Sequence, residues 1–322
     1  MQPQAFYRVV ADDFAAVDAI IRQQLTSRVP LVEKIGEYIT SAGGKRLRPL
    51  LVLLAGNALG ISGYRLNLLA ASIEFLHTAT LLHDDVVDKS DMRRGRATAN
   101  AMWGNAPSVL VGDFLYARSF EMLVELGVYP IMQILANATR VIAEGEVLQL
   151  SQQRDASTTE EIYMEVIRGK TAMLFEAATQ GAGLLAEAPA EQTEALRQFG
   201  DALGVAFQLV DDWLDYRGDS ATLGKNVGDD LAEGKATLPL IYAMREGTPE
   251  QAALVRRAVQ QGGLDDMEAV LAAIEDSGAL EYTAQKAREQ AARAIACLDH
   301  LPAGQYRDAL VELTEFAVAR TY

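Results

Sequence analysis

The sequence lacks the features of a secreted, membrane-spanning or nucleic-acid-binding protein. Its single cysteine, Cys297, excludes an intrachain disulfide and a thiolate metal site, and suits a reducing compartment. No apolar run approaches the roughly 20 residues of a membrane span, and the N-terminal residues carry no signal-peptide pattern. Acidic residues outnumber basic ones by 44 to 29, which argues against nucleic acid or anionic membrane as a partner. We expect a soluble, cytoplasmic protein without stable membrane insertion.

Alternating β-branched runs are also scarce, and no sheet is expected. Ala, Leu, Glu and Gln dominate, and apolar residues recur three and four positions apart in nearly every window, which predicts helices throughout. None of the breaks between these helices is a long linker with a shift in composition. The sequence therefore predicts an all-α fold, a single helical-bundle domain over residues 1–322.

Two aspartate clusters stand out on this apolar background. Asp84-Asp85-Val86-Val87-Asp88 and Asp211-Asp212-Trp213-Leu214-Asp215 share the pattern DDxxD. Three carboxylates within five helical residues repel one another and are costly unless a cation neutralises them. A lone pattern of this kind would more often be a helix cap or a solvated face, but two with matching apolar flanks favour metal binding.

Magnesium is the cation that these clusters fit best. In a helix the first and last aspartate of each cluster lie one turn apart on one face. Mg²⁺ takes few protein carboxylates and completes its coordination with water and phosphate oxygens. Two facing clusters would therefore clamp a diphosphate. The predicted metal ligands are Asp84, Asp85, Asp88, Asp211, Asp212 and Asp215.

Basic residues occur at helix breaks, where they could select a diphosphate. The run Gly43-Gly44-Lys45-Arg46-Leu47-Arg48-Pro49 places three cations after a glycine turn and before a helix, which suits phosphate through charge and backbone N–H groups. Helical spacing puts His77 on one stripe with Asp84, which favours ligand binding over the default role of a core histidine. The other basic residues at breaks are Arg93, Arg94, Lys170, Lys225 and Lys235.

Together these motifs resemble, in order and over most of the chain, those of the trans-prenyl diphosphate synthases, which add isopentenyl diphosphate to an allylic diphosphate. The run from His77 to Asp88, followed by Met92-Arg93-Arg94-Gly95, is most similar to the long-chain bacterial members, the octaprenyl and nonaprenyl diphosphate synthases. The resemblance implies a helical bundle of the isoprenoid synthase type with a central active-site cavity. It also implies a homodimer and about two to three bound Mg²⁺ ions.

The resemblance further implies a role for each matching residue. Metal and cations would stabilise the allylic diphosphate as it leaves, and the double bond of isopentenyl diphosphate would attack the allylic cation. The residues implied to be catalytic are Asp84, Asp85, Asp88, Arg93, Lys170, Asp211 and Lys225. Those implied to surround the allylic diphosphate are Arg93, Lys170, Thr171, Gln208, Lys225 and Lys235. Those implied to bind isopentenyl diphosphate are Lys45, Arg48, His77 and Arg94.

Product length should be set below the first cluster, where the prenyl chain grows away from the metals. The resemblance implies that small residues at this depth favour a long product, because the family's short-chain members tend to carry bulky aromatic residues there. The candidate positions are Leu76, Ala79, Thr80, Met122 and Leu123. We expect octaprenyl diphosphate, made from farnesyl diphosphate for the ubiquinone side chain, with nonaprenyl (solanesyl) diphosphate as the alternative. Two further alternatives are a terpene cyclase and a non-catalytic regulatory subunit. A terpene cyclase would need no second diphosphate pocket, which the basic motifs here provide. Non-catalytic regulatory subunits tend to have lost an aspartate cluster, and this chain has both.

Overall fold

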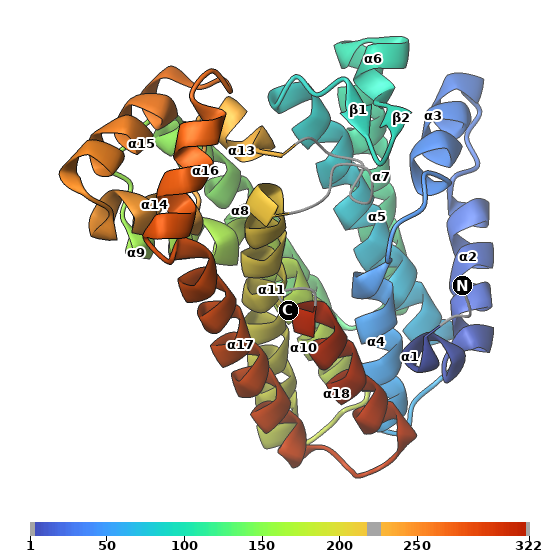
Figure 1. Ribbon diagram of the computed structural model, residues 1–322. Coiled ribbons are helices and arrows are strands. Elements are labelled where there is room, and N and C mark those ends of the chain that lie inside the picture. Colours follow the sequence, from blue (N-terminus) through green and yellow to red (C-terminus); the bar gives the residue numbers. More distant parts are fainter. Residues whose placement is uncertain (1–3, 218–226, 320–322) are drawn as a thin grey trace. The chain divides into compact units, whose positions relative to one another are not determined.

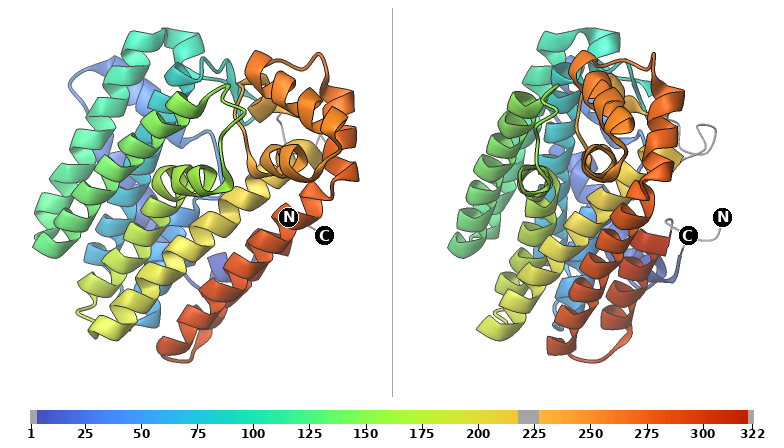
Figure 2. Two further views of the ribbon diagram at one scale, coloured as in Figure 1. Left: turned by 90° about the vertical axis from the view of Figure 1, so that its left-hand side faces the viewer. Right: turned by 60° about the vertical axis from the view of Figure 1, so that its left-hand side comes forward.

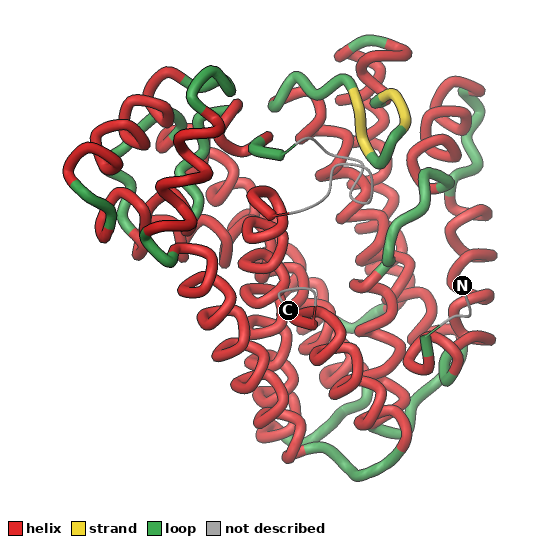
Figure 3. Tube along the Cα trace, in the orientation of Figure 1, coloured by secondary structure: helices red, strands yellow, loops and turns green. Residues whose placement is uncertain are grey.

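The computed structural model describes residues 4–217 and 227–319. These residues form helices joined by short loops, with one two-stranded antiparallel hairpin (Figure 3). The predicted all-α class is confirmed, whereas the expectation of no sheet is wrong at this hairpin. No helix in the described part of the chain is both long enough and apolar enough to cross a membrane.

The elements follow one another along the chain as labelled in Figure 1. The N-terminal elements are α1 (Ala5–Arg8), α2 (Ala11–Gln24), α3 (Pro30–Thr40), α4 (Leu47–Ala58), α5 (Tyr64–Val87), β1 (Met92–Arg93), β2 (Arg96–Ala97), α6 (Ala99–Trp103) and α7 (Asn105–Leu126). The middle elements are α8 (Tyr129–Gln152), α9 (Glu160–Ile167), the π-helix η1 (Arg168–Ala172), α10 (Met173–Leu185) and α11 (Ala190–Arg217). The C-terminal elements are α13 (Asp229–Ala232), α14 (Leu238–Glu246), α15 (Pro249–Gln261), α16 (Met267–Asp276), α17 (Ala279–Cys297), the 3₁₀ helix η2 (Leu298–His300) and α18 (Gln305–Val318).

The chain forms two compact units, and neither is continuous in sequence. The first unit comprises Met1–Asn137, Leu174–Arg197 and Cys297–Leu313. The second comprises Ala138–Met173, Gln198–Ala296 and Thr314–Tyr322. Helices α8, α10, α11, α17 and α18 contribute residues to both units. The single domain over residues 1–322 remains a prediction.

Helix α5 is the centre of the first unit. It packs against α2, α4 and α7, which run alongside it in the views of Figures 1 and 2. A helix surrounded by others is apolar on most of its faces, and α5 buries Leu66, Leu69, Ile73 and Phe75. Gly56 of α4 allows the close packing, because a Cβ atom there would lie 2.4 Å from a methyl carbon of Leu66. The first aspartate cluster thus lies at the end of a rigidly packed helix.

The second unit has its own apolar core. It is built from α11 residues such as Val205 and Leu209, together with Leu240 of α14 and Val255 of α15. Helix α14 packs against α15, α16 and α9. This core fixes the half of α11 that carries the second aspartate cluster.

A capping box begins α15 in the second unit. The Thr248 hydroxyl accepts a hydrogen bond from the Gln251 backbone N–H, and the Gln251 side chain accepts one from the Thr248 N–H. We expect Thr248→Ala to lower the free energy of unfolding by about 1 kcal/mol, because it leaves a helix-end N–H without this acceptor. Urea denaturation measures the change. Thr248→Ser keeps the oxygen and is the control; an equal loss in both variants would contradict the prediction.

Candidate active site

The first aspartate cluster occupies the end of α5. Asp84 and Asp85 lie in its last turn, and Asp88 is its C-cap. Asp85 is only 1% exposed, and Arg93 donates from Nε and Nη2 to its Oδ1 at 2.8 Å each. Burial raises the pKa of Asp85, Arg93 opposes that rise, and Asp84 and Asp88 add to it. The second oxygen, Oδ2, has no hydrogen-bond partner among the described residues.

A buried carboxylate oxygen without a partner is costly, by about 1–3 kcal/mol or more. Such an oxygen beside two further carboxylates suits a bound cation, because the cation would satisfy it and relieve the repulsion. No group of three or more Asp, Glu, His or Cys side chains in the described ranges is arranged to hold a metal ion by itself. Mg²⁺ usually completes its coordination with water and phosphate oxygens, so binding by the six aspartates remains a prediction.

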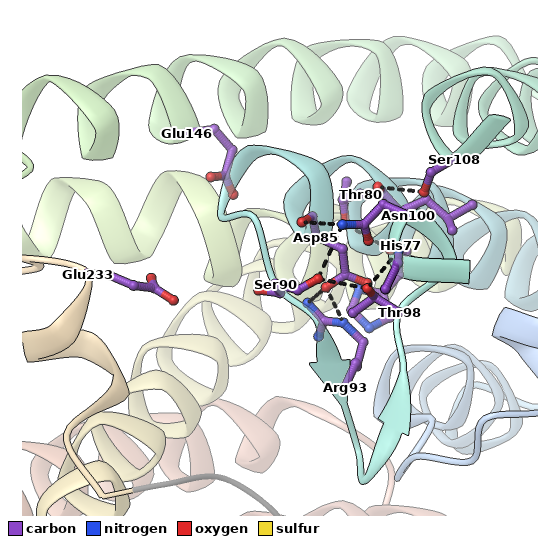
Figure 4. A network of polar contacts seen from close by, with 12 residues as sticks. His77, Thr80, Asp85, Ser90, Arg93, Thr98, Asn100, Ser108, Glu146 and Glu233 are labelled. Atoms are coloured by element: carbon purple, nitrogen blue, oxygen red, sulfur yellow. Dashed lines mark hydrogen bonds and ion pairs between the residues drawn. The ribbon is translucent and has the colours of Figure 1, made fainter. Parts of the chain in front are cut away.

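The hairpin β1–β2 holds Arg93 next to Asp85, as Figure 4 shows. Its turn is Arg94-Gly95, where φ is 52° and 72°, and positive φ at both central residues is typical of a tight two-residue hairpin. The Asn100 side chain donates to the backbone oxygens of Asp85 and Ser90, at 3.3 and 3.2 Å. The segment after α5 is therefore tied back to the end of that helix.

The residues implied to bind isopentenyl diphosphate lie partly together in the first unit. Arg48 Nη1 lies 3.2 Å from His77 Nε2, and its guanidinium carbon lies 4.7 Å from the centre of the Phe175 ring. Burial lowers the pKa of Arg48 to about 10. Burial, and then Arg48 and the two arginines of the hairpin, hold the pKa of His77 well below its ordinary value. Because Arg48 can only donate, the neutral His77 accepts at Nε2 and carries its proton on Nδ1.

Glu74 is a largely covered carboxylate that lies outside the sequence motifs. Its side chain is 12% exposed, and Arg46 Nε lies 3.4 Å from its Oε1. Burial raises the pKa of Glu74, while Arg46, Arg48 and Arg94 lower it. Helical spacing placed Glu74 on the stripe of His77 and Asp84, which was the available signal. The carboxylate therefore offsets part of the positive charge around Arg48.

Arg94 packs directly on the glycine turn before α4. Its Nη1 donates to the Gly43 carbonyl oxygen. A Cβ atom on Gly44, where φ is 130°, would lie 2.4 Å from the same Nη1. Glycine is therefore required here for the approach of Arg94. Lys45 is exposed at this turn, and its backbone oxygen accepts from the Tyr7 hydroxyl.

The second aspartate cluster lies in the last two turns of α11 and is held from inside the second unit. Asp212 is 3% exposed; Tyr163 donates to its Oδ2, and Gln208 Nε2 donates to its Oδ1 at 2.7 Å. The Thr171 hydroxyl in turn donates to Gln208 Oε1 at 2.8 Å. Burial is the main cause that raises the pKa of Asp212, and the charge of Asp230 is the next. The hydrogen bonds from Tyr163 and Gln208 lower it. Thr171 and Gln208, predicted to contact diphosphate, thus also support an aspartate.

Asp215 connects α11 with the residues that follow the undescribed segment. Its Oδ2 accepts from the Asp230 backbone N–H at 3.2 Å, in the first turn of α13. Its backbone oxygen accepts from the Gly228 N–H at 2.9 Å. Lys235 forms an ion pair with Glu233. Lys225, predicted to be catalytic, lies outside the described residues.

Lys170 belongs to the π-helix η1, a wider helical turn where the sequence predicts a break. Its Nζ donates to Glu146 Oε2 and Gln149 Oε1, at 2.9 Å each. A Cβ atom on Gly145 of α8 would lie 2.8 Å from the Lys170 backbone nitrogen. Single π-helical turns are frequent at functional sites, and this one is packed closely against α8.

The positions predicted to control product length lie in the first unit. Leu76, Ala79, Met122 and Leu123 are buried in α5 and α7. Thr80 is half-buried, and its hydroxyl donates to the His77 backbone oxygen at 2.7 Å. Their role in product length remains a prediction.

Comparison with known proteins identifies what the chain is similar to. Residues 29–276 match the family model described as polyprenyl synthetase. The chain is 53% identical over 321 residues to the octaprenyl diphosphate synthase of Escherichia coli (strain K12), covering 99% of both chains. It is 51% identical over 312 residues to the all-trans-nonaprenyl-diphosphate synthase (geranyl-diphosphate specific) of Rhodobacter capsulatus, covering 97% of this chain and 96% of the relative. A crystal structure of polyprenyl synthase from Caulobacter crescentus CB15, complexed with calcium and isoprenyl diphosphate, superimposes with a TM-score of 0.94 at 46% identity, covering 99% of this chain and 98% of the other.

The contact of Gly145 with η1 generates a testable prediction. We expect Gly145→Ala to lower the free energy of unfolding by about 1–3 kcal/mol, because the new methyl group meets backbone that cannot rotate away. We also expect weaker binding of magnesium pyrophosphate, since Lys170 moves with η1. Denaturation and calorimetric titration measure the two effects.

Gly181→Ala is the matched control, because a Cβ atom at this helical glycine meets its nearest neighbour at an ordinary 3.5 Å. That variant should leave pyrophosphate binding unchanged. Equal behaviour of the two variants would contradict the proposed importance of the Gly145 contact.

Proposed function

The chain belongs to the polyprenyl synthetase family and is a prenyl transferase, and we propose that it makes octaprenyl diphosphate. It would condense isopentenyl diphosphate repeatedly onto an allylic diphosphate, with farnesyl diphosphate as the starting substrate. The observation that carries the proposal is that both aspartate clusters are intact, in a chain similar over its whole length to an octaprenyl diphosphate synthase. Nonaprenyl diphosphate is the alternative product and is less favoured.

Mg²⁺ would be held by Asp84, Asp85 and Asp88 of α5 and by Asp211, Asp212 and Asp215 of α11. The partnerless Oδ2 of Asp85 supports this assignment, as does the gathering of negative charge at two helix ends. The calcium and isoprenyl diphosphate bound by the Caulobacter relative are also in agreement with it. When bound, Mg²⁺ supplies positive charge that stabilises a leaving diphosphate.

The chain's own groups would bind and orient the two substrates. Arg93, Lys170, Thr171, Gln208, Lys225 and Lys235 would lie around the allylic diphosphate. Lys45, Arg48, His77 and Arg94 would bind isopentenyl diphosphate, which does not lose its diphosphate. Neutral His77 offers this second diphosphate a donor at Nδ1 while Arg48 occupies Nε2.

The reaction would need no protein nucleophile. The carbon–oxygen bond of the allylic diphosphate breaks, and the double bond of isopentenyl diphosphate forms the new carbon–carbon bond. The proton then leaves to the departed diphosphate, so the product is five carbons longer and again an allylic diphosphate. Arg and Lys donors placed where negative charge develops stabilise this step.

We further propose a single functional domain over residues 1–322 that acts as a cytoplasmic homodimer and supplies a ubiquinone side chain. Large apolar side chains exposed on the first unit are in agreement with a second copy as partner, because burying them would remove apolar surface from water. They are Leu110 and Val124 of α7 and Tyr129 at the start of α8.

The product assay is the direct test of the proposed function. Purified protein is incubated with farnesyl diphosphate, labelled isopentenyl diphosphate and Mg²⁺, and the dephosphorylated products are separated against prenol standards. We expect a ladder ending at octaprenol, and its absence after Asp84→Ala in a protein that remains folded. A ladder ending at nonaprenol would instead identify nonaprenyl diphosphate as the product. No incorporation by folded wild-type protein would reject the proposal.

Product length should respond to Ala79, which is fully buried in α5 five residues before Asp84. We expect Ala79→Phe to shorten the main product, because the ring would obstruct the growing chain. Ala309→Phe overpacks another buried alanine of the same unit, in α18, and should leave product length unchanged. The same chromatography compares them, and an unchanged product from Ala79→Phe would remove this residue from the channel wall.

A further inference from the structure

Tyr163 is a core residue whose hydroxyl reaches the second aspartate cluster. It lies in α9, is 4% exposed and packs with the apolar residues of the second unit. Buried tyrosines usually find a hydrogen-bond partner for the hydroxyl. Here that partner is Oδ2 of Asp212, which lies 49 positions further along the chain. Neither the DDxxD pattern nor the basic motifs include this residue.

The Asp212 carboxylate is therefore fixed at both oxygens. Tyr163 donates to Oδ2, and Gln208 donates to Oδ1 while its own carbonyl oxygen accepts from Thr171. Its cluster neighbours differ, since Asp211 is exposed and Asp215 is half-buried. A carboxylate held by two donors cannot rotate freely, and each oxygen keeps a second lone pair for a further partner.

We propose that Tyr163 is a positioning residue for the second aspartate cluster. Its hydroxyl fixes the orientation of the Asp212 carboxylate and anchors this turn of α11 to α9. The cluster is therefore already ordered when the metal–diphosphate complex binds. The inference rests on the proposed function, in which this cluster holds Mg²⁺. Hydrogen-bonded partners behind metal-binding carboxylates commonly change metal affinity by about 10–100-fold.

The alternative is that Tyr163 only fills the core and satisfies its own hydroxyl. Tyr163→Phe removes the hydroxyl and keeps the ring, so either role predicts some loss of stability. Stability alone does not separate the two roles. Affinity for magnesium pyrophosphate does, because only the positioning role reaches the ligand.

Tyr282→Phe is the matched control. The Tyr282 hydroxyl also donates to a carboxylate in the second unit, at 2.9 and 3.0 Å from the two oxygens of Glu160. Removing it costs a bond of the same chemistry without touching Asp212. A general weakening of the unit should therefore affect both variants alike.

Calorimetric titration of magnesium pyrophosphate into the full-length protein is the test, and it requires no turnover. We expect Tyr163→Phe to bind at least about tenfold more weakly and Tyr282→Phe to bind as the wild type does. In steady-state assays, Tyr163→Phe should need more Mg²⁺ for half-maximal rate, with a smaller change in kcat at saturating Mg²⁺. In an Asp212→Asn background, Tyr163→Phe should add little further loss.

Three results would overturn the proposal. Unchanged affinity and Mg²⁺ dependence in Tyr163→Phe, with a wild type that binds magnesium pyrophosphate and extends an allylic diphosphate, would reject the role of Tyr163 alone. A full extra loss in the Asp212→Asn background would reject it as well. A wild type that neither binds nor extends would reject the proposed function and this inference together.

Discussion

Negative charge gathered at the C-terminal ends of two helices is the constraint on which the site depends. Helix α5 ends among Asp84, Asp85 and Asp88, and α11 ends shortly after Asp211, Asp212 and Asp215. A helix C-terminus already carries partial negative charge, and burial of the middle aspartate in each cluster raises its pKa further. The fold offsets part of this cost with Arg93 in one unit and with Tyr163 and Gln208 in the other. In each unit, the proposed Mg²⁺ would neutralise the carboxylate charge that remains.

The helical fold and the charged motifs could be predicted because their signals are local in sequence. Apolar spacing predicts the helices, and the DDxxD clusters and the glycine-flanked cations indicate the proposed site. The supports of that site could not be predicted in the same way. Tyr163 looks like any core aromatic in α9, and only the tertiary fold brings it to Asp212. Glu74 shared a stripe with His77, but its ion pair with Arg46 depends on the path of a separate loop.

Two local elements escaped prediction because each is too short for a periodic signal. Strands β1 and β2 have two residues each, which is a single repeat of strand alternation. The π-helix η1 was read as a break at Gly169, because glycine weakens a helix. Instead the helix continues through a wider turn, and a nearby glycine of α8, Gly145, leaves room for its backbone. The hairpin carries Arg93 and the π-helix carries Lys170, and both residues are predicted to bind diphosphate.

Two arginines of the first unit combine a strained backbone conformation with polar contacts of their side chains. Arg46 and Arg94 have φ of 46° and 52°, a left-handed conformation that is uncommon outside glycine and that concentrates at functional sites. Arg46 is tied by ion pairs to Asp18 and Glu74, and Arg94 by its hydrogen bond to Gly43. The ion pairs hold the Arg46 side chain against α2 and α5, and the hydrogen bond holds the Arg94 side chain against the glycine turn. An anion bound beside these arginines would be attracted to them and would offset their mutual repulsion. When no anion is bound, the Glu74 carboxylate offsets part of that repulsion.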